Sequence, residues 1–167
     1  GSNNIYRKEI DQLINQVSDI KPKKLSKIKN GISIYTDKNK KVFMDIVLPT
    51  SQSINDNLHA SSLGFEFSAL NEKIITNCGS VEKRIGKKPE YLRYSAAHST
   101  IILNNTNISE LIENKSYKRV PKKISFEIEE DENNIIWNSS HDGYLNNLHK
   151  IVKRRIIISK ESNNIVG

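Results

Sequence analysis

The sequence has very little cysteine and no long apolar segment. Cys78 is the only cysteine among 167 residues, so the chain can form neither an internal disulfide nor a Cys-x-x-Cys metal or redox motif. The first ten residues lack the apolar centre of a signal peptide, and no run of about 18 apolar residues predicts a membrane span. We therefore expect neither a signal peptide nor a transmembrane helix within this sequence.

Aromatic residues are also scarce, at 7% of the chain, and the basic runs show no aromatic stacking pattern of the kind that single-stranded nucleic-acid binders use. Lys and Arg number 26 against 19 Asp and Glu, which gives a formal net charge of +7. This excess attracts polyanions at long range, whether nucleic acids, acidic polysaccharides or anionic membrane surfaces. The missing stacking pattern disfavours specific nucleic-acid binding.

The length of 167 residues fits one compact domain with a single core. An amphipathic helix is predicted over residues 5–18, where apolar side chains recur at helical spacing, at Ile10, Leu13, Ile14 and Val17. The segment KPKKLSK then ends this helix. We assign residues 1–28 to the helix and a linker, and residues 29–167 to the main domain.

From Gly31 onward the pattern changes to short β-like runs. ISIY and KVFMDIVL, joined by the polar turn TDKNK, predict a hairpin and so two strands before Pro49. Further strands are predicted in LGFEFSA, KIITN, STIILNN, KISFEIEED, NIIWNSS and KIVKRRIIIS. Many short strands without intervening helices favour an antiparallel sandwich or barrel, and we expect the sandwich. The predicted fold class is mostly β, with a short N-terminal helix.

Two of the four histidines adjoin predicted strands. His59 opens HASSLGFEF, and His98 precedes STIIL. A neutral imidazole at a strand edge can bind a metal ion if other ligands converge on it. The separation of the two histidines along the chain does not match a short zinc motif, so the residues alone leave two interpretations open: a hydrogen-bonded histidine pair or a metal site.

Three blocks of sequence resemble, in order, the heparinase II/III-like family of polysaccharide lyases. They are HASSLGFEF, ITNCG and RYSAAHST, and a fourth block, SHDGY followed by LHKIVKRRIIIS, resembles the later strands of that family's sandwich. The resemblance covers the chain from about Asn30 to its end. It implies the family's C-terminal β-sandwich, with the α/α-toroid domain of the family absent from this chain.

The resemblance implies β-elimination on a uronic-acid polysaccharide. In this reaction a base removes the C5 proton, neutralisation of the carboxylate stabilises the enolate, and an acid protonates the leaving O4. The family's toroid supplies catalytic Asn, His and Tyr residues, so we expect this chain to be inactive in isolation. The implied partners are an acidic polysaccharide and the missing toroid domain. The implied location is a bacterial periplasm or cell envelope, although a chain without a signal peptide leaves the cytoplasm open.

The resemblance also assigns site residues. The family's metal-binding histidines correspond to His59 and His98, and its metal-binding aspartate corresponds to Asn77. A Zn²⁺ ion is therefore implied, with a weakened ligand set because an amide is a neutral donor. The family's catalytic histidine falls on Asn57, whose side chain does not titrate near neutral pH. A histidine cluster without zinc is the alternative.

Further polar residues are candidates for chemistry or binding. His141 and Tyr144 could titrate or hydrogen-bond, and Asp142 could hold His141 in one tautomer, but the Asp-Gly pair in SHDGY is also a strong turn signal. Arginine suits bidentate pairing with carboxylates and sulfates, so the candidate substrate contacts are Arg93, Arg154 and Arg155. Solvated charge on strand faces is the alternative for these arginines.

A second class of function stays open beside the lyase. The chain could be a non-catalytic carbohydrate-binding or structural sandwich, in which Asn57 and Asn77 have replaced the residues needed for the original chemistry.

Overall fold

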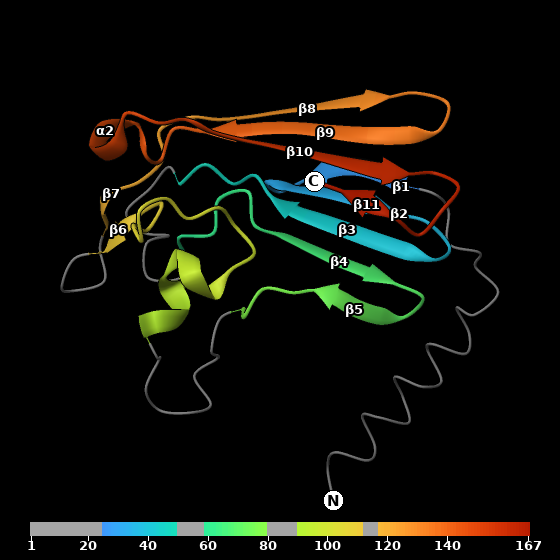
Figure 1. Ribbon diagram of the computed structural model, residues 1–167, viewed down its shortest axis with the longest axis horizontal. Helices are drawn as coiled ribbons and strands as arrows, with labels where there is room; N and C mark the ends of the chain where they lie inside the picture. Colours follow the sequence, from blue (N-terminus) through green and yellow to red (C-terminus); the bar gives the residue numbers. More distant parts are fainter. Residues whose placement is uncertain (1–24, 50–58, 80–89, 112–116) are drawn as a thin grey trace, which may run out of the picture.

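The computed structural model describes residues 25–49, 59–79, 90–111 and 117–167. The regular secondary structure of this part of the chain is mostly β-strand, with two larger antiparallel sheets and few helices (Figure 1). The helix predicted over residues 5–18 lies outside the described residues. None of the described helices is long and apolar enough to cross a membrane.

The first sheet contains five strands in chain order. They are β1 (Leu25–Lys29), β2 (Ile32–Thr36), β3 (Lys40–Asp45), β4 (Phe65–Ala69) and β5 (Glu72–Ile75). Each strand pairs antiparallel with the next. Short hairpin turns join β1 to β2, β2 to β3 and β4 to β5, whereas residues 46–64 connect β3 to β4. Alternation sets the two faces, since Tyr35 and Val42 are buried whereas Lys41 is exposed.

The sequence predicted two strands before Pro49, and the structure has three. The sequence did not predict β1, because three of its five residues are Lys or Ser and only Ile28 is of the β-branched or aromatic type that is typical of strands. The turn after β1 does carry a sequence signal, the pair Asn30-Gly31. Both residues have positive φ, 50° and 75°, as two-residue hairpin turns require. β1 begins at Leu25, inside the range that the sequence assigned to the helix and linker.

The second sheet contains four strands in the order β11-β10-β9-β8. Their bounds are Ile124–Glu130 for β8, Asn134–His141 for β9, Val152–Ser159 for β10 and Ile165–Val166 for β11. A one-turn helix, α2 (Leu145–Leu148), lies between β9 and β10. A separate two-stranded ribbon joins β6 (Glu110–Leu111) to β7 (Tyr117–Arg119).

The strand predicted in STIILNN is wrong. This segment contains one isolated bridge, between Leu103 and Thr106, and otherwise runs as irregular chain. Its hydroxyl groups bind loop carbonyls instead of continuing a ladder; Thr100 Oγ1 donates to the Ser62 carbonyl at 2.7 Å. Asn104 has a φ of 48°, in the left-handed region, which ends any extended run.

The main core lies between the two larger sheets, as in a β-sandwich (Figure 1). Its buried side chains come from both sheets and from the segment before β4, and they are Tyr35, Val42, Met44, Leu63, Phe67, Ala69, Ile135, Trp137, Ile156 and Ile158. A second, smaller cluster contains Ile108, Tyr144 and Val152, and Leu148 of the helix α2 packs against it. Burial of this apolar surface is the main contribution to the stability of the fold.

Arg154 on β10 connects the second sheet to two irregular segments beside the first. Its Nη1 atom donates to the carbonyl of Leu63 and, at 2.7 Å, to the carbonyl of Ser99. The guanidinium also lies 5.1 Å from the centre of the Phe65 ring, within the range of a cation–π contact. Arg155, the next residue, is exposed.

These contacts predict that Arg154→Met destabilises the chain by about 1–3 kcal/mol, because two loop carbonyls lose a charged donor while the aliphatic stem is kept. Urea denaturation followed by circular dichroism measures the change. The matched control is Arg155→Met, which removes the same charge from an exposed site and is expected to change stability by less than about 0.5 kcal/mol. Equal effects of the two substitutions would contradict the bracing role of Arg154.

Candidate functional site

His59 and His98 come together in the fold although 39 residues separate them in the chain. His59 Nδ1 lies 3.2 Å from His98 Nε2, and the two rings meet edge to face with centroids 5.2 Å apart. His98 follows two short 3-10 helices, η3 (Glu90–Arg93) and η4 (Ser95–Ala97). We call these two residues the histidine pair.

Backbone and hydroxyl contacts hold the segments of the histidine pair side by side. The Ala60 amide donates to the Arg93 carbonyl at 2.9 Å, and the buried Ser95 hydroxyl donates to the Ala60 carbonyl at 2.8 Å. Ser95 in turn accepts from the Ile108 amide at 2.9 Å. The residue after His59 is therefore fixed directly to both helices that precede His98.

Both imidazoles are neutral near pH 7. Burial lowers the pKa of His59 and of His98, and the proximity of His98 lowers that of His59 further. His98 Nε2 lies 3.0 Å from the Leu92 carbonyl, which can only accept, so we place the His98 proton on Nε2. His59 Nδ1 is then an acceptor facing the same N–H. His98 Nδ1 is buried without a hydrogen-bond partner among the described residues.

Asp45, at the end of β3, is a site residue that the sequence reasoning missed. Its carboxylate accepts from the Ser61 hydroxyl at 2.8 Å and from the Val47 amide at 3.0 Å. Burial raises the pKa of Asp45, and the neighbouring His59 acts in the opposite direction, which places the carboxylate close to the histidine pair. The available signal was an acidic residue inside the apolar run KVFMDIVL.

Asn77 contacts the backbone beside His98. Its Oδ1 atom accepts from the Ser99 amide at 2.8 Å and lies 3.0 Å from the Ser99 hydroxyl. The Cys78 amide donates to the Ala97 carbonyl at 3.1 Å, while the Cys78 side chain is exposed. Asn77 therefore holds the segment that carries His98, and its amide oxygen is engaged with Ser99. Asn57 lies outside the described residues.

The three candidate arginines occupy different settings. Arg93 is 7% exposed, and its charge contributes to the lowered pKa of His59, so it lies near the histidine pair. Arg154 braces the two loops described above. Arg155 is exposed on the other face of β10. Of the three, Arg93 is the one whose charge acts on the histidine pair.

His141 and Tyr144 form a separate buried group around the turn after β9, with ring centroids 5.8 Å apart. The Gly143 amide donates to His141 Nδ1 at 3.1 Å. The Tyr144 hydroxyl lies 3.1 Å from the Ile101 carbonyl and 2.9 Å from that of Thr106. Burial lowers the pKa of His141 to about 4 and raises that of Tyr144.

Among the described residues, the hydrogen bonds of the Asp142 carboxylate join it to backbone amides and not to the His141 ring. Its Oδ1 atom accepts from the amides of Lys122 and Lys123 at 2.8 and 3.0 Å. The Asp142 carbonyl also accepts from the Leu145 amide at 2.8 Å. The carboxylate thus caps the segment before β8, and the tautomer of His141 is set by Gly143.

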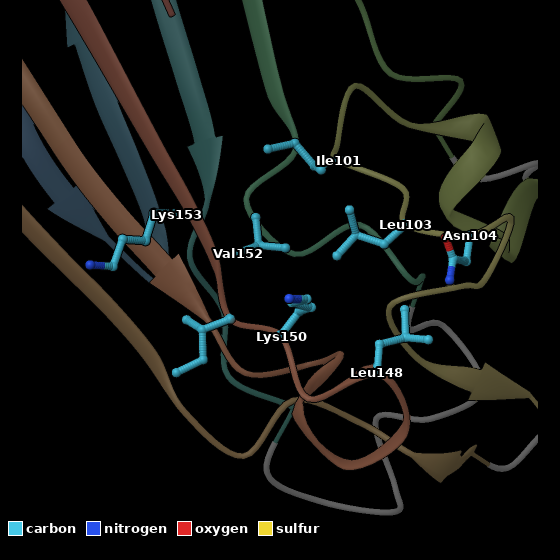
Figure 2. Close-up of a pocket in the computed structure, with 8 residues that line it drawn as sticks. Ile101, Leu103, Asn104, Leu148, Lys150, Val152 and Lys153 are labelled. Atoms are coloured by element: carbon cyan, nitrogen blue, oxygen red, sulfur yellow. The ribbon is translucent and has the colours of Figure 1, made fainter.

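Two pockets lie near these groups. One pocket, of about 330 Å³, is lined by residues of β2, β3 and β4, among them Asp45 of β3, and by Asn77. The other, of about 430 Å³, is lined by aliphatic side chains that include Ile101 and Val152, with Lys150 and Lys153 among them (Figure 2). The first pocket therefore shares residues with the surroundings of the histidine pair, and the second does not.

Residues 25–167 match the family described as heparinase II/III-like, C-terminal. The chain belongs to this family. A search of curated proteins gives no match.

Solved structures show the same fold. A heparan sulfate lyase HepC mutant from Pedobacter heparinus aligns with a TM-score of 0.59 at 17% identity, over 95% of this chain and 26% of that chain. A heparinase III with methylated lysines aligns with a TM-score of 0.52 at 15% identity, over 93% and 25%. The chain thus spans about a quarter of the length of these similar structures.

The residues near the histidine pair only partly suit the zinc ion that the resemblance implied. Two nitrogen ligands of one tetrahedral zinc lie roughly 3.3 Å apart, and His59 Nδ1 and His98 Nε2 are 3.2 Å apart. A zinc site needs at least a third protein ligand, and the part of the chain that the structure describes contains no group of three His, Cys, Asp or Glu residues suited to a metal. The described donors therefore fall short of a zinc site.

The low pKa of His141 predicts a loss of stability in acid. Because its folded pKa of about 4 lies below the ordinary 6.5, protons bind the unfolded chain more readily. The stabilisation is complete above pH 6.5 and declines, by about 3 kcal/mol in all, as the pH falls toward 4. In His141→Leu this part of the pH dependence should disappear when the free energy of unfolding is measured by urea titration across that range.

A matched control is His149→Asn, because His149 is exposed and has a φ of 54°, a conformation that asparagine tolerates. This variant should keep the pH dependence of the natural chain. If His141→Leu kept the same slope as well, the buried neutral histidine would not be its source.

Proposed function

We propose that this chain is the β-sandwich part of a heparinase II/III-like polysaccharide lyase, which cleaves a uronic-acid polysaccharide by β-elimination. The observation that carries the proposal is the family match over residues 25–167. The net charge of +7 suits a polyanionic substrate. Because the similar structures are about four times longer than this chain, the complete activity belongs to a larger protein.

The histidine pair and Arg93 are the described groups best suited to border the substrate. β-Elimination develops negative charge on the uronate carboxylate, and an arginine beside that carboxylate would stabilise it. His59 Nδ1 accepts from the Nε2–H of His98, which fixes the proton of the neutral His59 on its Nε2 atom as a hydrogen-bond donor. We assign the principal base and acid to the toroid domain, as the family resemblance implies.

His141 and Tyr144 have no part in the proposed chemistry. Both side chains are buried, at 1% and 0% exposure, and His141 Nδ1 and the Tyr144 hydroxyl face backbone groups of the turn and loop around them. Because the pKa of Tyr144 is raised, less of its hydroxyl is ionised at neutral pH, and it is less available as a general base. We infer that these two residues fix the turn after β9.

We predict that the 167-residue chain alone forms no product. Without the toroid domain the substrate lacks a base and an acid on its far side, so incubation with heparin, heparan sulfate or alginate should give no ultraviolet absorbance of unsaturated uronate. A complete lyase of the family serves as the positive control. Formation of unsaturated uronate by the isolated chain would show that its own residues are sufficient.

A non-catalytic carbohydrate-binding sandwich is the second candidate. It is favoured by the engagement of Asn77 with Ser99, since this amide stands where the resemblance places an aspartate and contacts backbone. The two candidates differ in what they require beyond this chain. A lyase requires a toroid domain with catalytic Tyr and Asn-His residues, and a binding protein does not.

Zinc binding stays a prediction of the resemblance, with His59 and His98 as the described ligands. Metal analysis of the chain purified with zinc in the medium tests it, beside a His59→Gln, His98→Gln double variant. One zinc per chain that is lost in the double variant would support a site completed by residues beyond those described. Zinc-free protein, together with a lower stability of the double variant, would identify the histidine pair as structural.

A further inference from the structure

A small polar pocket of about 200 Å³ lies at the turn between β2 and β3. Its lining residues are Asp37, Lys38, Asn39, Lys40, Lys41, Ser68, Asn71 and Lys73. We call it the lysine pocket. Figure 1 shows the β2–β3 and β4–β5 turns at one end of the first sheet and the short helices before His98 at the other. Along β3, Lys41 and Asp45 are separated by about 13 Å at the usual rise per residue.

Strand register places two lysines around one serine. Lys41 on β3 is paired with Ser68 on β4, and Ser68 is paired with Lys73 on β5. Lys41 and Lys73 are both exposed and stand about 10 Å apart at Cα, two strand spacings, on the same face. Flexible lysine side chains can converge over Ser68 from this distance.

The only carboxylate that lines the pocket is already engaged. Asp37 accepts from Lys40 Nζ at 2.6 Å and from the Tyr35 hydroxyl at 2.9 Å. It also accepts from the amides of Asn39 and Lys40 at 2.8 and 2.9 Å. Burial acts to raise the pKa of Asp37, but these hydrogen bonds outweigh it and the pKa lies below its usual value. Asp37 is therefore ionised and neutralises Lys40, which is 3% exposed.

Three lysines of the lining are left without a lining carboxylate to balance them. They are Lys38, Lys41 and Lys73, and all three are exposed. Lys41 and Lys73 lie on either side of β4, and like charges gathered at one end of a sheet repel one another, so this arrangement does not serve the stability of the sheet. A bound anion would offset the repulsion, and the Ser68 hydroxyl and the side-chain amides of Asn39 and Asn71 could donate to its oxygens.

We propose that the lysine pocket binds a sulfate or carboxylate group of an acidic polysaccharide, at a position along the sheet separate from the histidine pair. This inference rests on the proposed function. A polymer with repeated anions could contact both ends of the sheet at once, and a second contact raises affinity by keeping the polymer near the first.

The test compares two double variants that lose the same charge. Lys41→Gln with Lys73→Gln alters the lysine pocket, whereas Lys122→Gln with Lys123→Gln removes two exposed lysines before β8. Isothermal titration at fixed ionic strength measures binding of a sulfated heparin oligosaccharide and of an unsulfated uronate oligosaccharide. We expect affinity to fall on the order of tenfold for the pocket variant and less than about twofold for the control.

Each other outcome overturns the inference in a distinct way. If both double variants lose affinity equally, net charge and not the pocket determines binding. If the natural chain binds a glycan and the pocket variant binds it equally well, the lysine pocket is excluded while the proposed function stands. If the natural chain binds neither oligosaccharide, the lysine pocket is excluded as a glycan site, while the proposed function still rests on the family match. If the pocket variant weakens binding of a DNA oligonucleotide or of inorganic phosphate as much as that of the glycans, the site is a general anion site.

Discussion

The guanidinium of Arg154 connects the second sheet to both segments that carry the histidine pair. One acceptor is the carbonyl of Leu63, in the segment that begins at His59. The other is the carbonyl of Ser99, directly after His98. Burial lowers the pKa of Arg154, yet an arginine keeps its charge at neutral pH. The geometry of the candidate site on one sheet therefore depends on a cation supplied by the other.

The fold was predictable where one side of a strand faces the core. At the start of β8, partly buried Ile124 and Phe126 alternate with exposed Ser125 and Glu127, and this period is visible in the sequence. STIILNN has similar apolar residues but is irregular, and the hydroxyls of Thr100 and Ser99 donate to the carbonyls of Ser62 and Phe65. Periodicity cannot distinguish these cases, because the partners of the backbone are remote in sequence.

The candidate site was predictable only in part. Blocks of family resemblance pointed to His59 and His98, but their contact depends on the helices before His98 and on the hydroxyl of Ser95. Asp45 could not be assigned, because a carboxylate at the end of an apolar strand gives no sign of which loop will cover it. The placement of Lys41 and Lys73 on either side of Ser68 likewise depends on the register of three strands, which the sequence does not show.

The outer strands of the two sheets have a bearing on self-association. β8 forms one described edge of the second sheet, and its Glu127 and Glu129 are exposed. An open edge offers unpaired backbone groups to any other strand, and charged side chains are a common means of preventing such pairing. Antiparallel pairing of β8 with β8 of another molecule would align two acidic rows. Although the chain as a whole is basic, the edge strand β8 is acidic, and this charge opposes edge-to-edge pairing with a second copy.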